Sequence, residues 1–373
     1  MLITLQNIAH HAQLAKSTVS MALRGHRRIG SATRERVQQL AQELGYRPNP
    51  LVTAHMASLR NGRSAGCGLV VGFVSPLSRS EVARLRAPHE NYFFGARARA
   101  AELGIGVEYF HCAAGARAGR ELSRILAVRG IEGVIVAPAT DGGEPYLPAL
   151  EWSGLATAAI GHAIEAVEVH SVGCDEPRLF RAMEERMAAG GFRRIGLALR
   201  GDISARSGYA WLGGMLAHNA LQPPSARVPA LVPPAGKWSQ AAFLRWFHRH
   251  RPDALIVGDD EPVRWLRAAG FRVPGDVSCA TLGWSGSCPE LAGYYQNYES
   301  TGAIALDLVV AQLHRNERGA PAIPQNVLVQ AGWRGGATLA APPGPGRILD
   351  PLLAGISSDP GRRDDGAALA HEL

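Results

Sequence analysis

The chain has 373 residues, a formal net charge of +7, 46% hydrophobic and 19% charged residues, a composition that is typical of folded globular proteins and excludes a disordered chain. Nine basic and two acidic side chains fall within residues 1–63, whereas the remaining 310 residues carry 30 of each sign, so the positive excess lies entirely at the amino end. The five cysteines lack C-x-x-C spacing, no signal peptide is recognised and no apolar run reaches ~18 residues, so we expect a cytoplasmic protein with neither disulfide framework, zinc site nor membrane contact. A polyanion is the expected partner of the amino end, and a basic surface that merely faces solvent is the alternative.

Two short amphipathic helices are predicted at the amino end. Thr4 can cap the first helix. Its apolar side chains recur at helical spacing: Leu5, Ile8, Ala9 and Ala12. After a break at residues 13–15, a second helix begins at Lys16 and turns Val19 and Ala22 to its apolar side. Two short helices, a three-residue turn and a polar outer face indicate a helix-turn-helix, whose second helix has the size that fits the major groove of DNA.

A third helix is predicted from Ser31 to Leu44. Its apolar side, with Leu40 and Ala41, is expected to cover the first two helices and to close a three-helix core. The segment YRPNP at residues 46–50 ends this unit, because proline interrupts helical hydrogen bonding.

These segments resemble the DNA-binding headpiece of the lactose-repressor/galactose-repressor (LacI/GalR) family of bacterial transcription regulators. The matching stretches are TLQNIA at residues 4–9, KSTVSMALRG at residues 16–25 and ATRERVQQLAQELGYRPNP at residues 32–50. Two positions of the turn depart from the family's pattern: Gln13 stands where glycine is usual, and Ala15 stands where a capping serine is usual.

The resemblance implies that the second helix reads base edges through Lys16, Ser17 and Met21. Lysine can donate to guanine O6 and N7, serine to several base edges, and methionine offers only an apolar contact. The other DNA contacts that we expect, mostly to phosphates, are Thr4, Thr18, Ser20 and Arg28. For Lys16, a simple phosphate contact is the alternative.

Residues 49–65 are expected to form a hinge helix and a linker. In the family, such a segment folds on the operator and inserts an apolar side chain into the minor groove, which unstacks bases and bends the DNA. The inserting position falls on His55, where leucine is usual, with Met56 beside it. A histidine that faces solvent in a linker helix is the alternative.

The larger part of the chain alternates apolar strands with helical stretches. The expected strands are residues 68–74, 106–110, 133–137, 156–160, 194–199, 253–257 and 277–282. The expected helices are residues 91–103, 118–129, 176–189, 205–220, 239–250 and 261–269. Apolar strands that alternate with helices indicate parallel sheets covered on both faces.

The resemblance extends more loosely to about residue 340. It implies an all-α helix-turn-helix headpiece followed by an α/β, periplasmic-binding-protein-like (type I) domain of two lobes, with a ligand cleft at the carboxyl ends of the strands. We place lobe one at residues 66–161 plus 295–324, and lobe two at residues 162–294 plus 325–340. The predicted domains are a headpiece at 1–48, the hinge and linker at 49–65, an effector-binding and dimerisation domain at 66–340, and a tail at 341–373 whose Pro, Gly and Asp content predicts disorder.

Four residues are expected to contact an effector in the cleft. Arg206 and Asp259 can hydrogen-bond a polyol, and Tyr92 or Trp284 can stack on a ring. The surrounding motifs differ from the family's pattern, since no Asn precedes Asp259 and the usual Gly-Phe-Asp-Asp reads GWSG from residue 283. The alternative is that these are loop residues of a cleft whose ligand has changed or been lost.

The sequence therefore predicts a sequence-specific regulator that binds double-stranded DNA, and the resemblance implies a repressor that binds a palindromic operator as a homodimer, because no carboxyl-terminal heptads for a tetramer are present. A sugar-like small molecule is the expected effector. The alternative is a regulator of the same fold without an effector, controlled by a protein partner or by its abundance. No catalytic motif, cofactor motif or metal-ligand pattern supports an enzyme.

Overall fold

The computed structural model describes residues 5–23, 29–44, 69–85, 89–138, 148–161, 168–234, 236–286 and 288–340. The expected hinge and linker at 49–65 and the expected tail at 341–373 lie outside the described residues. Four of the expected DNA contacts also lie outside them: Thr4, Arg28, His55 and Met56.

Three short helices form the amino-terminal unit, with the bounds that the sequence predicts to within one residue: α1 (Leu5–Ala12), α2 (Lys16–Leu23) and α3 (Ser31–Glu43). Their apolar sides meet at Ile8, Val19 and Val37, which are fully buried. The turn between α1 and α2 places Gln13 at φ 51°, in the left-handed region where glycine is favoured. This conformation explains why a glycine is expected there.

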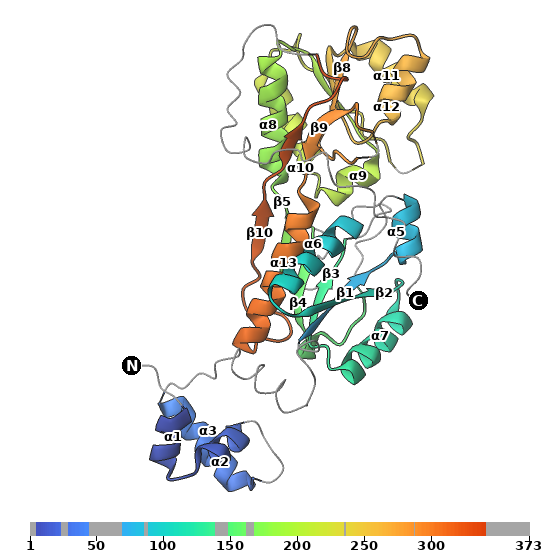
Figure 1. The fold of residues 1–373 in the computed structure, drawn as a ribbon. Coiled ribbons are helices and arrows are strands. Elements are labelled where there is room, and N and C mark those ends of the chain that lie inside the picture. The colour runs from blue at the N-terminus through green and yellow to red at the C-terminus, as the bar shows by residue number, and fades with distance from the viewer. Residues whose placement is uncertain are drawn as a thin grey trace.

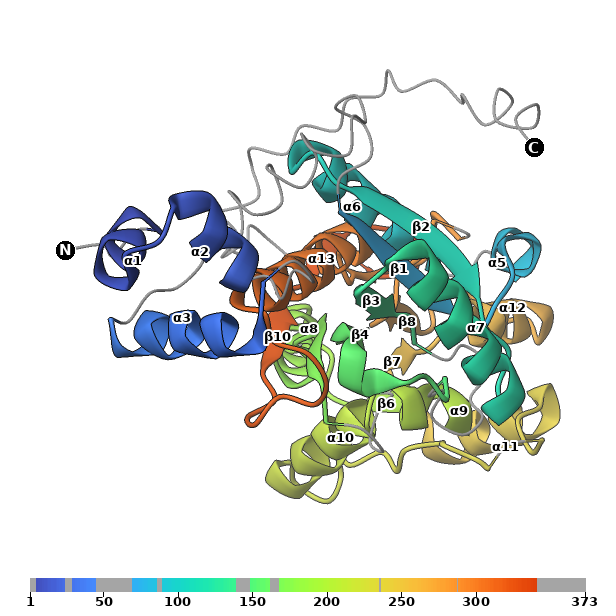
Figure 2. The same cartoon turned by 90° about the horizontal axis from the view of Figure 1, so that it is seen from below.

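The first lobe is built on a sheet of six parallel strands in the order β10-β5-β4-β3-β1-β2. Its strands are β1 (Val70–Ser75), β2 (Gly106–His111), β3 (Gly133–Val136), β4 (Ala156–Ile160), β5 (His170–Cys174) and β10 (Asn326–Val329). Its helical elements are α5 (Arg79–Leu85), α6 (His89–Glu102), α7 (Ala116–Arg129), the 3-10 turn Trp152–Gly154 and α13 (Tyr298–Arg315). Seen from below in Figure 2, α6 and α13 cover one face of the sheet and α7 covers the other, so each face has its own apolar cluster.

Helices α6 and α13 approach so closely that two glycines are required between them. A Cβ atom at Gly95 would lie 1.9 Å from the carbonyl oxygen of Glu299, and one at Gly302 would lie 1.9 Å from that of Tyr92. The close approach brings Tyr92 against the first residue of α13, Tyr298.

The second lobe is built on a five-stranded sheet in the order β11-β9-β8-β7-β6, which is parallel except for β11. Its strands are β6 (Ile195–Ala198), β7 (Ala254–Val257), β8 (Ser278–Thr281), β9 (Ala292–Tyr295) and β11 (Gly332–Arg334). Its helices are α8 (Glu176–Ala189), α9 (Gly201–Arg206), α10 (Ala210–Leu221), α11 (Gln240–His250) and α12 (Glu261–Ala268). One apolar cluster joins α8 and α10 to the sheet, and another joins α11 and α12 to it, so this sheet is also covered on both faces.

The chain crosses between the lobes three times: from β5 to α8, from β9 to α13 and from β10 to β11. This arrangement confirms the predicted fold class, a helical headpiece plus a two-lobed α/β domain, and Figure 1 shows α5 and α9 where the two lobes face each other. Among the described residues, no helix combines the length and apolar character that crossing a membrane requires.

The expected boundary between the lobes is wrong in two places. β5 and β10 pair with each other and belong to the first sheet, whereas residues 162–294 and 325–340 were expected in lobe two. Both strands are short and mix polar with apolar residues, so neither has the run of apolar residues by which the other strands are predicted. The helix expected at 205–220 is also split into α9 and α10, because Tyr209 takes a left-handed conformation at φ 60°.

Candidate nucleic-acid interface and ligand cleft

Helix α2 presents a polar side to solvent. Val19 and Ala22 are fully buried in the headpiece core, whereas Lys16 and Ser17, in the first turn of the helix, have exposed side chains. The three other described candidates on this helix are half-buried: Thr18, Ser20 and Met21. Exposed hydrogen-bonding groups at the amino end of a short helix are the arrangement that reaches base edges in the major groove.

Two arginines of α3 have structural partners within the headpiece. The Arg36 guanidinium donates to the carbonyl oxygen of Ala12 at the end of α1, and Arg34 donates to that of Ile29 over 3.1 Å. The Arg36 bond thus joins α3 to α1, and Lys16 is the cation of α2, where it is exposed.

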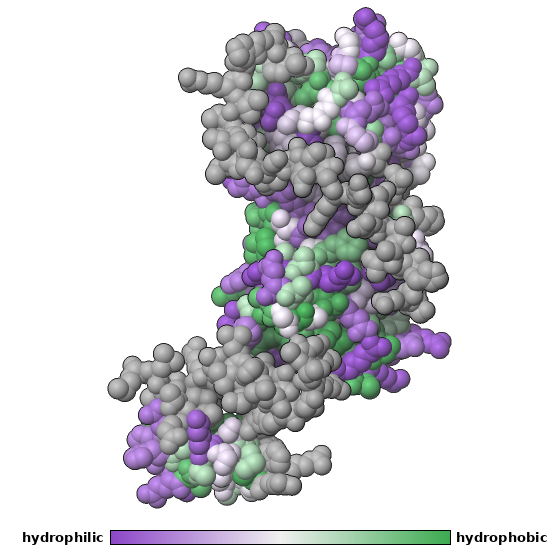
Figure 3. All heavy atoms as spheres, in the orientation of Figure 1, coloured by the Kyte–Doolittle hydropathy of each residue, from purple (hydrophilic) through white to green (hydrophobic). Residues whose placement is uncertain are grey.

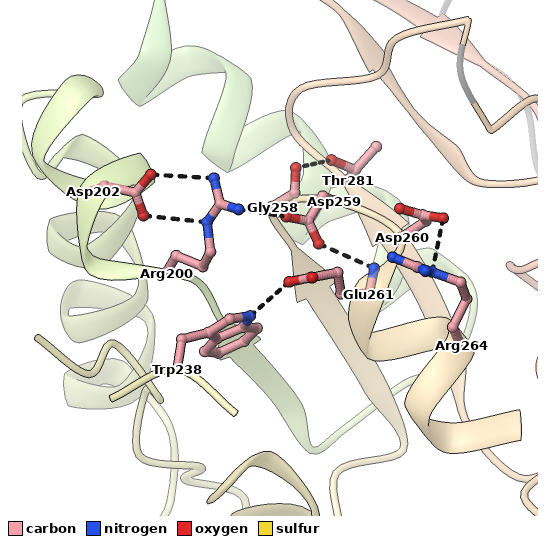
Figure 4. A network of polar contacts seen from close by, with 9 residues as sticks. All are labelled: Arg200, Asp202, Trp238, Gly258, Asp259, Asp260, Glu261, Arg264 and Thr281. Carbon is pink, nitrogen blue, oxygen red and sulfur yellow. Dashed lines mark hydrogen bonds and ion pairs between the residues drawn. The ribbon is translucent and has the colours of Figure 1, made fainter. Parts of the chain in front are cut away.

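A polar network lines the carboxyl ends of β6 and β7 in the second lobe (Figure 4). Arg200 follows β6 and donates twice to Asp202, over 3.2 and 3.1 Å, while its guanidinium also lies 3.9 Å from Asp259. The other carboxylate oxygen of Asp259 accepts from the backbone N–H of Glu261 at the start of α12, over 3.0 Å. Burial is the main cause that raises the pKa of Asp259 above its ordinary value. Asp259 therefore already has two protein partners.

Asp259 and Trp284 share a pocket of about 310 Å³, which also includes its open mouth. Thr281 and Ser285 contribute to its lining, so hydroxyl groups stand beside the carboxylate and the indole. The Trp284 indole N–H is buried and has no acceptor among the described residues. A buried donor without an acceptor is costly, so a ligand or a water that accepts from it is favoured at this place.

Tyr92 and Arg206 meet in a second group, nearer the crossovers. The Tyr92 ring packs edge-on against Tyr298, with 5.3 Å between ring centroids. Arg206, at the end of α9, is exposed, and desolvation by the neighbouring protein is the main cause that lowers the pKa of its guanidinium. Burial raises the pKa of the Tyr92 and Tyr298 phenols, and the charge of Arg206 opposes that rise. Because Tyr92 is buried in the apolar cluster of α6 and α13, its ring is largely withdrawn from a ligand.

A buried carboxylate that the sequence does not single out adjoins this second group. Glu176, the first residue of α8, is 7% exposed and accepts from the indole N–H of Trp211 on α10. Gln296, in the second crossover, lies 3.4 Å from the other carboxylate oxygen. Burial raises the pKa of Glu176 to about 7. An acidic residue at the start of a helix is ordinarily explained by its favourable interaction with the helix dipole. The sequence alone therefore does not mark Glu176 as a functional residue.

Two family models match the chain. The model of bacterial regulatory proteins of the lacI family matches residues 4–49, and that of the periplasmic binding protein-like domain matches residues 185–338. Residues 4–49 thus form a LacI-family headpiece, and residues 185–338 belong to a periplasmic binding protein-like domain.

The curated relatives of the chain are regulators by name. The maltose regulon regulatory protein MalI of Escherichia coli is 28% identical over 215 residues, which cover 57% of this chain and 54% of that protein. The sucrose operon repressor of Klebsiella pneumoniae is 40% identical over 72 residues, which cover 18% of this chain and 20% of that protein. The chain therefore matches about half the length of the maltose regulator.

Solved structures extend the likeness along most of the chain. The complex of the transcriptional regulator CelR with cellobiose has a TM-score of 0.55 at 20% identity and covers 90% of this chain and 99% of that one. The lac repressor dimer bound to operator and an anti-inducer has the same TM-score and identity, covering 91% and 100%. At this identity, the likeness shows the fold alone, a helical headpiece followed by a two-lobed α/β domain.

Within this fold, the candidate residues fall into three places. Five of the nine expected DNA contacts are described, and all five lie on α2. The four expected effector residues form two pairs, Asp259 with Trp284 in the pocket and Tyr92 with Arg206 near the crossovers. The described residues contain no group of three His, Cys, Asp or Glu side chains arranged to hold a metal ion.

Proposed function

We propose that this chain is a sequence-specific, DNA-binding transcription regulator. The observation that carries the proposal is the first turn of α2, where Lys16 and Ser17 are exposed while Val19 and Ala22 of the same helix are buried in the core. This helix lies within residues 1–63, which hold the entire positive excess of the chain. Positive charge supplies the affinity for phosphates that is independent of sequence, and the exposed donors of α2 supply the reading of bases. A DNA partner implies work in the cytoplasm.

The regulator is proposed to act as a repressor on a near-palindromic operator. The sucrose operon repressor and the maltose regulon regulatory protein are its named relatives. Two headpieces related by a twofold axis read two half-sites, so the symmetry of the operator follows from that of the protein. Apolar side chains gather over α6 and α13 in Figure 3, and Phe94 and Leu103 are 41% and 40% exposed there. This face supports a homodimer formed through the large domains.

A sugar or related metabolite is the proposed effector. Trp284 offers a ring and an N–H without a protein acceptor, beside the carboxylate of Asp259. Among structures of this fold, one relative is in complex with cellobiose and another has bound glucose. Binding in the cleft would change the angle between the lobes and so alter operator affinity.

A regulator that binds no small molecule remains the second candidate, and the contacts of Asp259 favour it. Both carboxylate oxygens of this residue already have protein partners, Arg200 and the Glu261 N–H. A thermal-shift screen of the full chain against sugars and sugar acids separates the two candidates, because an effector stabilises the protein by RT ln(1 + [L]/Kd). No shift with any of these compounds favours the second candidate.

The test of DNA reading compares the chain's two lysines. Full-length protein is first used to select binding sites from a palindrome library, and gel-shift titrations then compare Lys16→Ala with Lys237→Ala, which removes the same charge from an exposed site in lobe two. Lys16→Ala is expected to weaken operator binding by roughly tenfold or more and to change the preferred base at one position of each half-site. Lys237→Ala is expected to change neither.

Two results would argue against this proposal. A uniform loss across all sequences in Lys16→Ala would make Lys16 a phosphate contact. If the wild-type chain preferred no duplex over random competitor at moderate ionic strength, DNA reading itself would be refuted. Specific binding should also weaken steeply with salt, because several phosphates release counterions.

A further inference from the structure

Glu176 occupies the point where two of the three crossovers meet lobe two. It begins α8 directly after β5, and only 7% of it is exposed. Its carboxylate accepts from Trp211 of α10 on one side and faces the Gln296 amide of the second crossover on the other. The same Gln296 amide nitrogen donates to the carbonyl oxygen of Leu282, over 3.1 Å, just after β8. A change in the angle between the lobes must alter these contacts.

Among the described residues around Glu176, no cationic side chain forms an ion pair with its carboxylate. Asp175 precedes it as the cap of α8, and Cys174 ends β5. Tyr92 of α6 and Tyr298 of α13 face it from lobe one, and the charge of Arg206 acts on these two tyrosines. No ion pair of Glu176 occurs among the described residues. A carboxylate buried in this way favours its neutral form over its charged form.

We propose that Glu176 is a proton-sensitive contact between the lobes, whose ionisation changes the lobe arrangement and thereby the affinity for the operator. The predicted change in operator affinity rests on the proposed function, whereas the predicted protonation of Glu176 does not.

The donors around Glu176 explain how one proton changes the crossover. The charged carboxylate accepts from both Trp211 and Gln296. When a proton from solvent binds one oxygen, that O–H has to donate, and both neighbours present donors to it. The Gln296 amide then turns so that its oxygen accepts, and its nitrogen is withdrawn from the Leu282 carbonyl. Binding of the proton thus replaces the hydrogen bond from Gln296 to Leu282 with one from Glu176 to Gln296, so the second crossover stays joined to lobe two in the arrangement described here.

The direction of the effect follows from burial. Burial raises the pKa of Glu176 to about 7, the Trp211 hydrogen bond opposes this rise, and Asp175 adds to it. A lobe arrangement that hydrates Glu176 returns its pKa toward that of a free glutamate. Rising pH therefore favours the arrangement with Glu176 hydrated, and falling pH favours the arrangement described here.

The experiment measures operator affinity of the full chain between about pH 6 and pH 8 for wild type, Glu176→Gln and Asp175→Asn. One linked proton changes Kd by at most about tenfold per pH unit, and we expect a change of about threefold to tenfold across this range. Glu176→Gln resembles the neutral acid, so it should hold the low-pH affinity throughout. Asp175→Asn is the matched control, since it removes the neighbouring carboxylate and keeps a capping residue, and it should retain a pH response of similar size, shifted to lower pH because Asp175 no longer raises the pKa of Glu176. A Glu176→Gln protein with the full wild-type response overturns the proposal.

A second measurement needs no DNA. Because the pKa of Glu176 is raised in the folded protein, its contribution to stability is fully present below about pH 4.5 and is lost as pH rises toward about 7. The melting temperature of wild type should therefore fall over this interval relative to that of Glu176→Gln. If no operator is bound at any pH, the proposed function fails, and this comparison alone decides whether Glu176 takes up the proton.

Trp211→Phe provides the variant for the case in which Glu176→Gln does not fold. It removes the hydrogen bond that lowers the pKa of Glu176, so the pH-dependent fall in melting temperature should extend to higher pH. An unchanged pH profile in Trp211→Phe contradicts the proposal.

Discussion

The headpiece and the cleft are built in opposite ways. The headpiece takes its core and its exposed donors from three helices within residues 5–43, and its contacts follow helical spacing. The groups near the crossovers come from α6, α8, α9, α10 and α13, so residues more than a hundred positions apart meet there. A short pattern can therefore specify the first region, whereas the second exists only once both lobes have formed. The predictions below test that difference.

The largest expected effect comes from the core of the headpiece. Ile8 is fully buried, and Ile8→Ala should lower the free energy of unfolding of the headpiece by about 2–5 kcal/mol. This loss is as large as the whole unfolding free energy expected for a unit of this size. Operator binding should fall at least about a hundredfold, while the melting of the large domain stays unchanged. Gel shift and circular dichroism of the full chain provide the two readouts. Val128→Ala, at a side chain that is 89% exposed on α7, is the control. An equal loss of stability in the large domain would show that the two regions unfold together.

A smaller effect is expected inside the first lobe. Gln312 of α13 is 2% exposed, and its side-chain amide accepts from the N–H of Thr157 over 3.1 Å and donates to the carbonyl of Thr157 over 3.0 Å. Gln312→Leu leaves both groups buried without these partners, at about 1–3 kcal/mol for each. The large domain should melt several degrees lower in calorimetry, with the headpiece unaffected. Gln240→Leu, at an exposed position of α11, should not lower it.

The smallest effect has the opposite sign. Gln13 holds φ 51°, which costs a residue with a side chain more than it costs glycine. Gln13→Gly should stabilise the headpiece by about 0.5–1 kcal/mol, after the greater freedom of glycine in the unfolded chain is allowed for. The melting of the headpiece signals by NMR measures this gain. A headpiece that melts lower would mean that the Gln13 side chain contributes more than its backbone costs.

The sequence predicts the bounds of α1, α8 and β4, because their apolar spacing and end signals are local. It misses α5, β5, β9, β10 and β11, which are short or mix polar and apolar residues. Their pairing partners lie far along the chain, as β10 does from β5. The apolar pattern alone therefore assigns them neither a type nor a lobe.

The candidate site is divided in the same way. Lys16 and Ser17 follow from the pattern of one helix, and the structure exposes both. The sequence singles out Tyr92, Arg206, Asp259 and Trp284, but it does not group them into two pairs. Glu176 and Trp211 escape notice, because an acidic helix start and a tryptophan in an apolar stretch have ordinary structural explanations. Only the folded lobes bring that carboxylate and that indole together.

The position of β10 in the first sheet has a consequence for synthesis of the protein. This strand and α13 lie beyond residue 297, yet they complete the sheet and one of its faces. A ribosome releases the amino end first, so a finished headpiece emerges long before the first lobe can close. Translation products that end early would thus carry a complete headpiece without a complete first lobe. Translation to residue 329 is needed before the first sheet can close, and with it the lobe through which the proposed homodimer would form.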